Sequence, residues 1–327
     1  MADSERYVDP YTCSGTVKPH AHFDANSDAE NLHKAMKGMG CNEDAVMKIL
    51  CCRSNDQRQK IKMAFKTLYG RDLVEQLVKE LKGHFEDVIV ALMDSSADYD
   101  AKQLRKAMAG VGTDEALLIE ILCSRTNQEI NDIKMAYRFL FARDLEKDIV
   151  SETSGDLERI LVSLCQANRD ESRSVNASQA RTSAEKLYKA GENRLGTDES
   201  TFNMILASQN FLQLQQVFRE YHTLRKHGIE KAIKSEFSGD VEAAFMTLVM
   251  CVKNRPLYFA NKLFYSMKGM GTRDEDLIRT VVTRCEKDMT QIKREYEMVH
   301  KKSLKSAISS DTSGDYKKAL LLLVEGN

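Results

Sequence analysis

Pairs of glycines separated by one residue recur in this sequence. Three pairs are complete, and a fourth copy keeps only the second glycine: Gly38 and Gly40, Gly110 and Gly112, Gly269 and Gly271, and Gly196. A single glycine is enough to end a helix, so the second one needs another explanation. A glycine pair between two helices can turn successive backbone carbonyls outward, and unpaired carbonyl oxygens are ligands for hard cations. The pairs are therefore candidate cation-binding loops.

An acidic residue follows the second glycine of every copy at the same distance of 40 residues. The four acids are Glu80, Glu152, Glu236 and Asp311. Aspartate and glutamate make up 49 of the 327 residues, so chance alone would place an acid at a given position about one time in seven. Three carbonyls, one carboxylate and room for water suit Ca²⁺ better than octahedral Mg²⁺. With one carboxylate each, the sites should be weak, and a lipid phosphate can complete them by sharing the cation.

Two other functions compete with this hypothesis. In the first, the glycines are only turns of a helical-repeat scaffold, an interaction protein that does not depend on calcium; this accounts for one glycine per copy but not for a fixed pair. In the second, the protein is an enzyme. No Ser/His/Asp or Cys/His set recurs with the copies, so we expect no enzymatic activity.

The loops belong to a longer repeat. The second glycines are spaced by 72, 84 and 75 residues, and another glycine series, Gly83, Gly155, Gly239 and Gly314, keeps the same spacings. Four copies of one unit are expected. Residues 167–183 contain one large apolar residue, Val175, and explain the longest spacing as a linker that divides the body into two halves of two consecutive repeats. We predict a tail at 1–22, repeats at 23–94, 95–167, 184–253 and 254–327, and a linker at 168–183.

The elements that position the loops are predicted to be helices. The chain has three prolines, and none lies between residues 20 and 255, so the fold class is all-α. Apolar residues such as Leu117, Leu118, Ile121 and Leu122 follow helical spacing. Each repeat has room for about five helices of ordinary length. Thr113, Asp114 and Glu115 stand where a helix should begin, with carboxylates in its first turn.

Charge and cysteine content limit the partners and the compartment. Lys and Arg total 48 against 49 Asp and Glu, without a block of like charge, which argues against nucleic acid and against a polybasic membrane anchor. An anionic membrane could be bound only if a cation supplied positive charge. The eight cysteines form no paired motif, and no signal peptide or apolar run long enough to span a membrane is present. We expect a cytoplasmic protein that becomes peripheral on membranes when calcium rises.

The units resemble annexin repeats from about residue 22 to residue 327. The resemblance rests on KGxG followed by TDE-like residues, on (D/E)TSGD, SRxN and GRDL, and on the ending DTSGDYKKALLLL. The core is most similar to vertebrate annexins with long Gly- and Pro-rich tails, although this tail is short. The resemblance implies four five-helix repeats packed as two halves in a curved disc. It also implies calcium-dependent binding to acidic, phosphatidylserine-like phospholipids through loops on the convex face.

Carried over position by position, the resemblance implies carbonyl ligands and one carboxylate in each repeat. The expected sets are Met36, Gly38, Gly40 and Glu80; Met108, Gly110, Gly112 and Glu152; Gly191, Arg194, Gly196 and Glu236; and Met267, Gly269, Gly271 and Asp311. The acids Glu43 and Glu115 either serve weaker secondary calcium sites or only favour helix N-termini. A protein that binds the tail, and self-association on membranes, are further candidate partnerships.

Several positions depart from the family pattern. Arg194 replaces the first glycine of the third loop, and Leu195 stands where many relatives have tryptophan. Gln209 replaces the arginine that the other repeats carry, which puts the contacts of that arginine in question. The family also has a polar channel, to which Asp100, Gln103, Arg125 and Arg279 would correspond. We expect an ion-pair network there rather than ion conduction.

Overall fold

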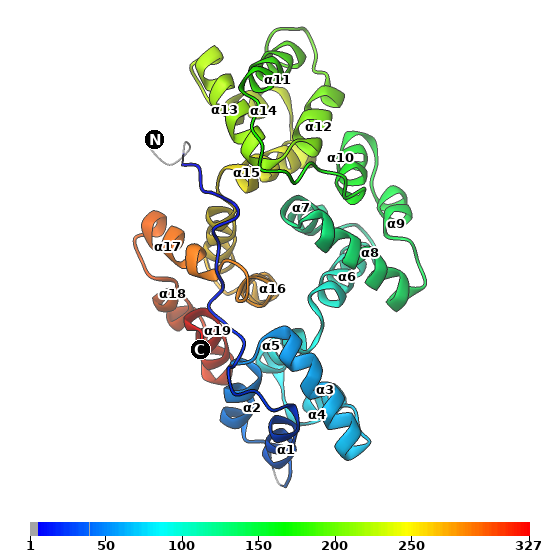
Figure 1. Ribbon diagram of the computed structural model, residues 1–327, viewed down its shortest axis with the longest axis vertical. Coiled ribbons are helices and arrows are strands. Elements are labelled where there is room, and N and C mark those ends of the chain that lie inside the picture. The colour runs from blue at the N-terminus through cyan, green and yellow to red at the C-terminus, as the bar shows by residue number, and fades with distance from the viewer. Residues whose placement is uncertain (1–5, 39) are drawn as a thin grey trace. The chain divides into compact units, whose positions relative to one another are not determined.

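A computed structural model describes residues 6–38 and 40–327. These residues form nineteen helices and no strand, which confirms the all-α class. Figure 1 shows how the helices follow one another along the chain. The first repeat contains α1 (Ala25–Ala35), α2 (Glu43–Leu50), α3 (Asn55–Tyr69), α4 (Leu73–Glu80) and α5 (Gly83–Met93). The second contains α6 (Ser96–Ala107), α7 (Glu115–Ser124), α8 (Asn127–Phe141), α9 (Leu145–Glu152) and α10 (Gly155–Cys165).

The third and fourth repeats share one long helical element. The third contains α11 (Ala177–Ala190), α12 (Glu199–Ser208), α13 (Phe211–Arg225) and α14 (Ile229–Glu236), and the fourth contains α16 (Asp274–Arg284), α17 (Met289–His300), α18 (Leu304–Asp311) and α19 (Gly314–Glu325). Between them, α15 (Gly239–Ser266) is two helices joined at Asn254, whose φ of −159° and ψ of 83° are not helical. Asn254 precedes Arg255 and Pro256, and proline removes a backbone donor. Counted on either side of this kink, every repeat has five helices.

Side-chain caps explain where the second and third helices of a repeat begin. Asp114 precedes α7 and accepts the N–H of Leu117 at 3.0 Å, as the sequence predicts for this helix start. Thr126 precedes α8 and forms a capping box with Glu129. Such caps satisfy backbone N–H groups that have no partner inside the helix, and each is worth about 1 kcal/mol. The polar residues of the SRxN-type motif therefore separate two helices.

The helices divide into two compact units that do not follow chain order. One unit comprises the described residues up to Tyr11 together with Asp100–Arg255, and the other comprises Thr12–Tyr99 together with Pro256–Asn327. The second repeat is thus grouped with the third, and the first with the fourth. Helix α5 contacts α16 and α19, and α10 contacts α12. The predicted halves of consecutive repeats are not the compact units, because these helix contacts join repeats that the chain order separates.

The predicted linker lies inside one compact unit. Residues 168–176 are not helical, but α11 begins at Ala177, so the second half of the segment predicted as linker is helix. Asn176 caps this helix by accepting the N–H of Gln179 at 2.9 Å. The non-helical part is held to the body, since Asn210 donates from Nδ2 to Asp170 at 2.8 Å and to the carbonyl of Ser174 at 3.0 Å. The segment is a structured connection.

The described part of the tail is extended and hydrogen-bonded to the body. In one unit, Val8 donates its N–H to the Lys253 carbonyl at 2.8 Å. Its own carbonyl accepts from Gln215 Nε2 at 3.0 Å. In the other unit, Thr16 donates its N–H to the Cys285 carbonyl at 2.7 Å. Residues 1–5 of the predicted tail lie outside the described residues.

Candidate functional site

The glycine loops join the first and second helices of each repeat and are closed by one recurring hydrogen bond. In the second repeat, Asp114 donates its N–H to the carbonyl of Ala107, the last residue of α6, at 2.9 Å. The same bond is made in the other repeats by Asn42 to Ala35 at 2.9 Å, Asp198 to Ala190 at 2.8 Å and Arg273 to Ser266 at 2.8 Å. The backbone between these bonded residues is held as a closed arc.

Within the arc, the glycine pair adopts backbone angles that other residues rarely take. Gly110 and Gly112 have φ values of 103° and 85°, and Gly269 and Gly271 have 115° and 89°. These are positive-φ conformations in which a Cβ atom would be strained. The chain needs two glycines because two positions of the arc require positive φ, which a single helix-ending glycine would not satisfy.

The carbonyl oxygens predicted as ligands are open in two of these loops. Among the described residues, no backbone N–H donates to the carbonyls of Met108, Gly110 and Gly112, nor to those of Met267, Gly269 and Gly271. Carbonyls without an N–H partner must be satisfied by water or by a cation. The residue between the glycines is fully exposed where it is described, as in Val111 and Met270. The corresponding Met39 of the first repeat lies outside the described residues.

Each acid of the 40-residue series is the last residue of the fourth helix in its repeat. Helix α4 ends at Glu80, α9 at Glu152, α14 at Glu236 and α18 at Asp311. The C-terminal end of a helix carries partial negative charge, so a carboxylate there is disfavoured by about 0.3 to 1 kcal/mol. The same unfavourable placement in all four repeats indicates a role other than helix stability.

Hydrogen bonds from a loop threonine bring loop and acid together in three repeats. Thr272 Oγ1 donates to Asp311 Oδ2 at 2.6 Å, and Thr197 Oγ1 donates to Glu236 Oε2 at 2.9 Å. In the second repeat, Thr113 Oγ1 donates to the backbone carbonyl of Glu152 at 3.2 Å. The side chain of Glu152 is exposed. The sequence predicted this proximity from a fixed spacing alone.

In the first repeat, Cys41 stands where the other loops have threonine. Burial of the thiol, together with the nearby carboxylates of Glu43 and Glu80, raises its pKa to about 11. Glu80 is thus within electrostatic range of the first loop. The carboxylate itself is hydrogen-bonded to the loop in the third and fourth repeats.

The third loop differs in geometry as well as in sequence. Its closing hydrogen bond joins residues that are eight positions apart, Ala190 and Asp198, whereas the other loops are closed between residues seven positions apart. Gly191 has φ −116° and ψ −105°, and its carbonyl already accepts the N–H of Arg194 at 3.1 Å. A Cβ at Gly191 would lie 3.1 Å from Cγ of Glu236, so this glycine is where the acid packs against the loop.

The third loop also contains a second acid, Glu192, whose carboxylate is bonded to residues of α13 and of the turn that follows it. Its Oε2 accepts from Tyr221 Oη at 2.6 Å and from Arg225 Nε at 3.2 Å, and His227 Nε2 lies 3.1 Å from Oε1. Partial burial raises the pKa of Glu192, but the hydrogen bonds from Tyr221 and Arg225 bring it below its ordinary value. The ionised side chain fixes the end of α11, on which the loop begins.

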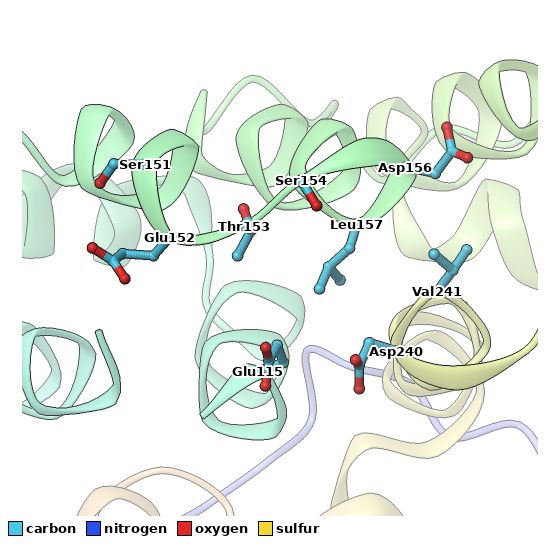
Figure 2. A pocket seen from close by; sticks show the side chains of 9 residues that line it. All are labelled: Glu115, Ser151, Glu152, Thr153, Ser154, Asp156, Leu157, Asp240 and Val241. Atoms are coloured by element: carbon cyan, nitrogen blue, oxygen red, sulfur yellow. The ribbon is translucent and has the colours of Figure 1, made fainter. Parts of the chain in front are cut away.

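Beside the acid of the second repeat lies a cavity of about 480 Å³. Figure 2 shows four acids around it, from the end of α9 and the starts of α7, α10 and α15: Glu152, Glu115, Asp156 and Asp240. Glu115 is the first residue of α7, so it occupies the helix end that favours negative charge. The negative charge of Glu115 thus stabilises the start of α7. The secondary calcium site stays a prediction.

The chemistry of these donors fits a hard cation. Nowhere in the described ranges do three or more His, Cys, Asp or Glu side chains gather as metal ligands would. The sites predicted at the loops would instead use backbone carbonyls and one carboxylate. Oxygen donors with room for water suit calcium, whereas zinc prefers nitrogen and sulfur ligands.

The sequence did not show which residue each arginine of the SRxN-type motif contacts. Arg53 forms an ion pair with Asp28 at 2.7 Å, and Arg125 forms the same pair with Asp100 at 2.6 Å. In the third repeat, Gln209 Nε2 donates instead to Ser183 Oγ at 3.0 Å. The replacement of arginine is thus matched by loss of the acid. The sequence contains all of these residues, but only the structure shows which of them are in contact.

In the fourth repeat the partner is aromatic. The guanidinium of Arg284 lies 4.4 Å from the ring centroid of Phe259, and its charge is neutralised by Asp288 at 2.7 Å. Each of the four motif positions is therefore satisfied by a contact within its own repeat.

Two of the predicted channel residues are arginines, and both are paired with acids. Arg125 pairs with Asp100 at 2.6 Å, and Arg279 pairs with Asp276 at 2.6 Å. Asp276 lies three residues before Arg279 in α16, so that pair is local to one helix. Each arginine thus has a carboxylate partner inside its own compact unit.

Comparison with known proteins identifies the family. The annexin family model matches residues 27–92, 99–164, 182–248 and 258–323. The chain is 53% identical over 310 residues to annexin A7 of Macaca fascicularis, covering 95% of this chain and 64% of that protein. It is 50% identical over 308 residues to annexin A13 of Canis lupus familiaris, covering 94% of this chain and 98% of that protein. The chain thus spans slightly less than two thirds of annexin A7.

Solved structures agree with this assignment. Annexin III superimposes with a TM-score of 0.94 at 43% identity, covering 96% of this chain and 98% of the other. Calcium-bound annexin (Sm)1 superimposes with a TM-score of 0.89 at 32% identity, covering 99% and 97%. Four matched repeats, the all-α fold and relatives of about half-identical sequence lead to one conclusion: the chain belongs to the annexin family.

Proposed function

We propose that this protein binds acidic phospholipid membranes in a calcium-dependent way through its four glycine loops. One observation carries the proposal: in every repeat an acidic residue ends a helix, where its charge is electrostatically disfavoured, and in three repeats a threonine of the glycine loop is hydrogen-bonded to that acid. A bound cation would be coordinated by this carboxylate and would neutralise its unfavourable charge. Membership of the annexin family and the likeness to calcium-bound annexin (Sm)1 support the choice of calcium.

Each loop would bind its cation through two kinds of oxygen ligand. The carbonyls of Met108, Gly110 and Gly112 and the carboxylate of Glu152 would hold the ion in the second repeat, and the equivalent residues in the others. When bound, calcium supplies positive charge and open coordination positions for a lipid phosphate. The chain itself carries a net charge of −1, so it has no electrostatic attraction of its own for an anionic bilayer. Four weak sites on one chain combine by avidity.

We expect the protein to bind at the membrane surface. In the described part of the chain, no helix has the length and apolar content that crossing a bilayer would require. Binding should therefore involve the loops, with the helices remaining in place.

The test is co-sedimentation with phosphatidylserine vesicles in calcium and in chelator, with phosphatidylcholine vesicles as the control. We expect the protein in the pellet only with phosphatidylserine and calcium, and release when chelator is added. Equal binding to phosphatidylserine in chelator would reject calcium bridging. Equal binding to both lipids in calcium would reject the preference for acidic headgroups.

A second prediction concerns the exposed apolar residue of the loops. Val111, Leu195 and Met270 are fully exposed, at 109%, 102% and 105%. Burying a side chain of this size contributes about 1.5 to 3 kcal/mol. Substituting all three with serine should weaken vesicle binding by roughly tenfold or more without removing its calcium requirement. Vesicle titration at fixed calcium measures the change.

The matched control for the loop substitutions is a second set of exposed apolar residues. Met63, Met135 and Phe139 are 71%, 64% and 87% exposed on α3 and α8. Changing these three to serine should leave vesicle affinity unaltered. If both sets weaken binding equally, the loop residues have no special contact with lipid.

A further inference from the structure

A cavity of about 270 Å³ in the unit formed by the second and third repeats is rich in arginine. Four arginines line it, together with two residues of the tail and the ring of a third-repeat phenylalanine: Arg125, Arg169, Arg173, Arg255, Pro10, Tyr11 and Phe211. All of these residues belong to one compact unit. The cavity contains none of the glycine loops or their acids.

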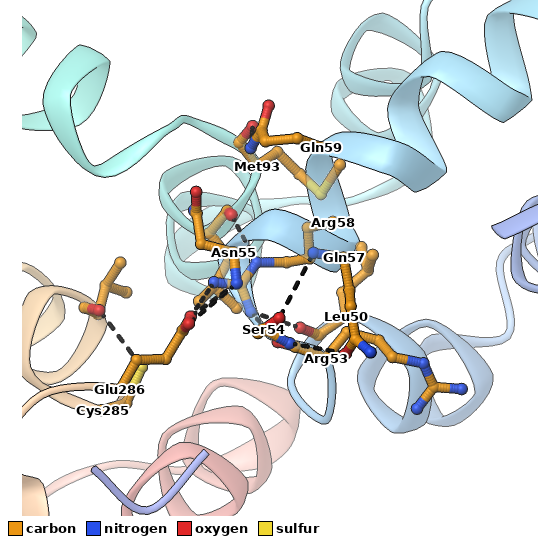
Figure 3. Close-up of polar contacts among 12 residues, drawn as sticks. Leu50, Arg53, Ser54, Asn55, Gln57, Arg58, Gln59, Met93, Cys285 and Glu286 are labelled. Carbon is orange, nitrogen blue, oxygen red and sulfur yellow. Dashed lines mark hydrogen bonds and ion pairs between the residues drawn. The ribbon is translucent and has the colours of Figure 1, made fainter. Parts of the chain in front are cut away.

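Elsewhere in the described chain, buried arginines are neutralised by acids. Arg58, Arg125, Arg279 and Arg284 are buried, and each has a carboxylate partner at 2.7 Å or less. Figure 3 shows the arrangement at Arg58, which donates to backbone carbonyls and also to Glu286 at 2.7 Å. This is the usual way in which a protein keeps a guanidinium out of water.

Arg169 is half-buried, and its guanidinium is stabilised in a different way. Its Nη1 donates to the carbonyls of Leu206 at 2.8 Å and Gln209 at 2.7 Å, and its guanidinium lies 5.1 Å from the ring centroid of Phe211. Among the described residues it forms no ion pair. Burial lowers its pKa to about 10.

The acids that line the cavity are engaged by other donors. Asp170 accepts from Asn210 Nδ2 at 2.8 Å and from the N–H of Ser172 at 2.8 Å. Glu171 accepts the N–H of Asn127 at 2.8 Å. Neither acid forms an ion pair with Arg169 in the described structure. The positive charge of Arg169 is therefore not compensated by direct contact.

A second guanidinium without an ion pair lies at the same cavity. Arg173 is exposed, and its guanidinium lies 4.3 Å from the ring centroid of Tyr11. No described carboxylate forms an ion pair with Arg173. The tail wall of the cavity is held in place near Tyr11, since Val8 is hydrogen-bonded through both its N–H and its carbonyl. The two unpaired guanidiniums thus line one cavity beside an anchored tail.

We propose that this cavity is a calcium-independent binding site for a phosphomonoester group, with Arg169 and Arg173 as its charged contacts. Guanidinium groups are suited to phosphate because they donate several hydrogen bonds in one plane. The volume lies at the lower limit of small-molecule pockets, about 300 Å³, so it favours a small phosphorylated ligand. Phe211 and Tyr11 offer aromatic rings to an organic part of such a ligand.

The experiment uses the full chain in chelator and phenyl phosphate as the probe, measured by isothermal titration calorimetry. Arg173→Gln should weaken binding by roughly tenfold to a hundredfold, as expected for loss of a hydrogen bond to a charged group. Arg169→Gln should weaken it at least as much. Arg173 is exposed, so its variant tests the proposal even if Arg169→Gln fails to fold.

The matched control is Arg181→Gln, which removes an arginine that is 74% exposed on α11 and pairs with Glu220 at 3.5 Å. It should bind phenyl phosphate as the unmodified protein does. A second arm replaces the probe with phosphatidylcholine vesicles containing phosphatidic acid, again in chelator. Arg173-dependent binding to phenyl phosphate indicates a soluble ligand, and such binding to the vesicles alone indicates a lipid headgroup. No binding in either arm, or binding that Arg173→Gln leaves unchanged, overturns the proposal.

Discussion

Removal of the four helix-ending carboxylates is expected to abolish calcium-dependent binding to phosphatidylserine vesicles. The variant combines Glu80→Gln, Glu152→Gln, Glu236→Gln and Asp311→Asn. Each loop loses the carboxylate that we propose binds the cation, and calcium affinity depends on the number of charged ligands. A single substitution should weaken its own site by roughly tenfold or more. The measurement is vesicle co-sedimentation over a calcium titration.

The same substitutions should not harm the fold. Each removes a negative charge from a helix C-terminus, which by itself favours the helix. Circular dichroism of the variant in chelator should therefore show unchanged helix content and thermal stability that is unchanged or higher. This separates loss of a ligand from loss of structure.

A matched control removes negative charges from the opposite ends of the same helices. Glu75 and Glu146 lie in the first turns of α4 and α9, at the opposite ends from Glu80 and Glu152. The double variant Glu75→Gln/Glu146→Gln should keep its calcium midpoint, whereas Glu80→Gln/Glu152→Gln should need more calcium. If the two pairs behave alike, the acids act through net charge only. The calcium-independent scaffold would then be the better explanation of the repeats.

The third repeat should contribute least to this effect. The Gly191 carbonyl already accepts an N–H, and Glu236 Oε2 already accepts from Thr197. Competing hydrogen bonds lower the gain from binding a cation. Among the four single variants, Glu236→Gln should shift the calcium midpoint the least.

Removal of Asp100 is expected to destabilise the protein strongly. Arg125 is the partner, and the exposed fractions of the two side chains are 0% for Arg125 and 5% for Asp100. Burial lowers the pKa of Arg125, but the charge of Asp100 and its hydrogen bond raise that pKa above the ordinary value, so the guanidinium is charged in the folded protein. Asp100→Ala would leave this buried charge unpaired, at a cost of about 3 to 5 kcal/mol. Urea unfolding followed by circular dichroism measures the loss.

The third repeat provides the control at the equivalent position. Ser183→Ala removes a neutral hydrogen bond to Gln209 and should cost only about 1 kcal/mol. The double variant Asp100→Ser/Arg125→Gln copies this neutral pair into the second repeat and should recover most of the stability lost in Asp100→Ala. If Asp100→Ala is no worse than Ser183→Ala, the buried pair does not carry the expected energy. If the double variant fails to recover, the surroundings of the pair rather than its charge decide stability.

Much of the candidate site could be predicted from the sequence because its parts lie at fixed offsets within one repeat. A 40-residue separation carried through four copies locates the acid beside the loop, since the same helices fold the same way each time. Helix starts such as Asp114 were predictable because capping depends on residues close together in the chain. The role of these residues in calcium binding stays a prediction until the experiments above are done.

Contacts between repeats could not be predicted in this way. Apolar faces recur in every repeat, so the pattern does not say which repeat packs on which, and the break in composition at 168–183 suggested the wrong compact halves. The pairing of Gln209 with Ser183 could not be predicted either, because hydrogen-bonding partners are determined by distance in space.

By itself, the sequence determined the four repeats, their all-α class, the glycine loops and the acids paired with them, because all of these depend on local propensity and internal periodicity. Only the tertiary structure decided which repeats form a compact unit. It also decided that Tyr11 of the tail meets Arg169, Arg173 and Phe211 around one cavity. The physical reason is that helix packing and charge pairing depend on which surfaces come into contact, and residues far apart in the chain carry no periodic signal of that contact.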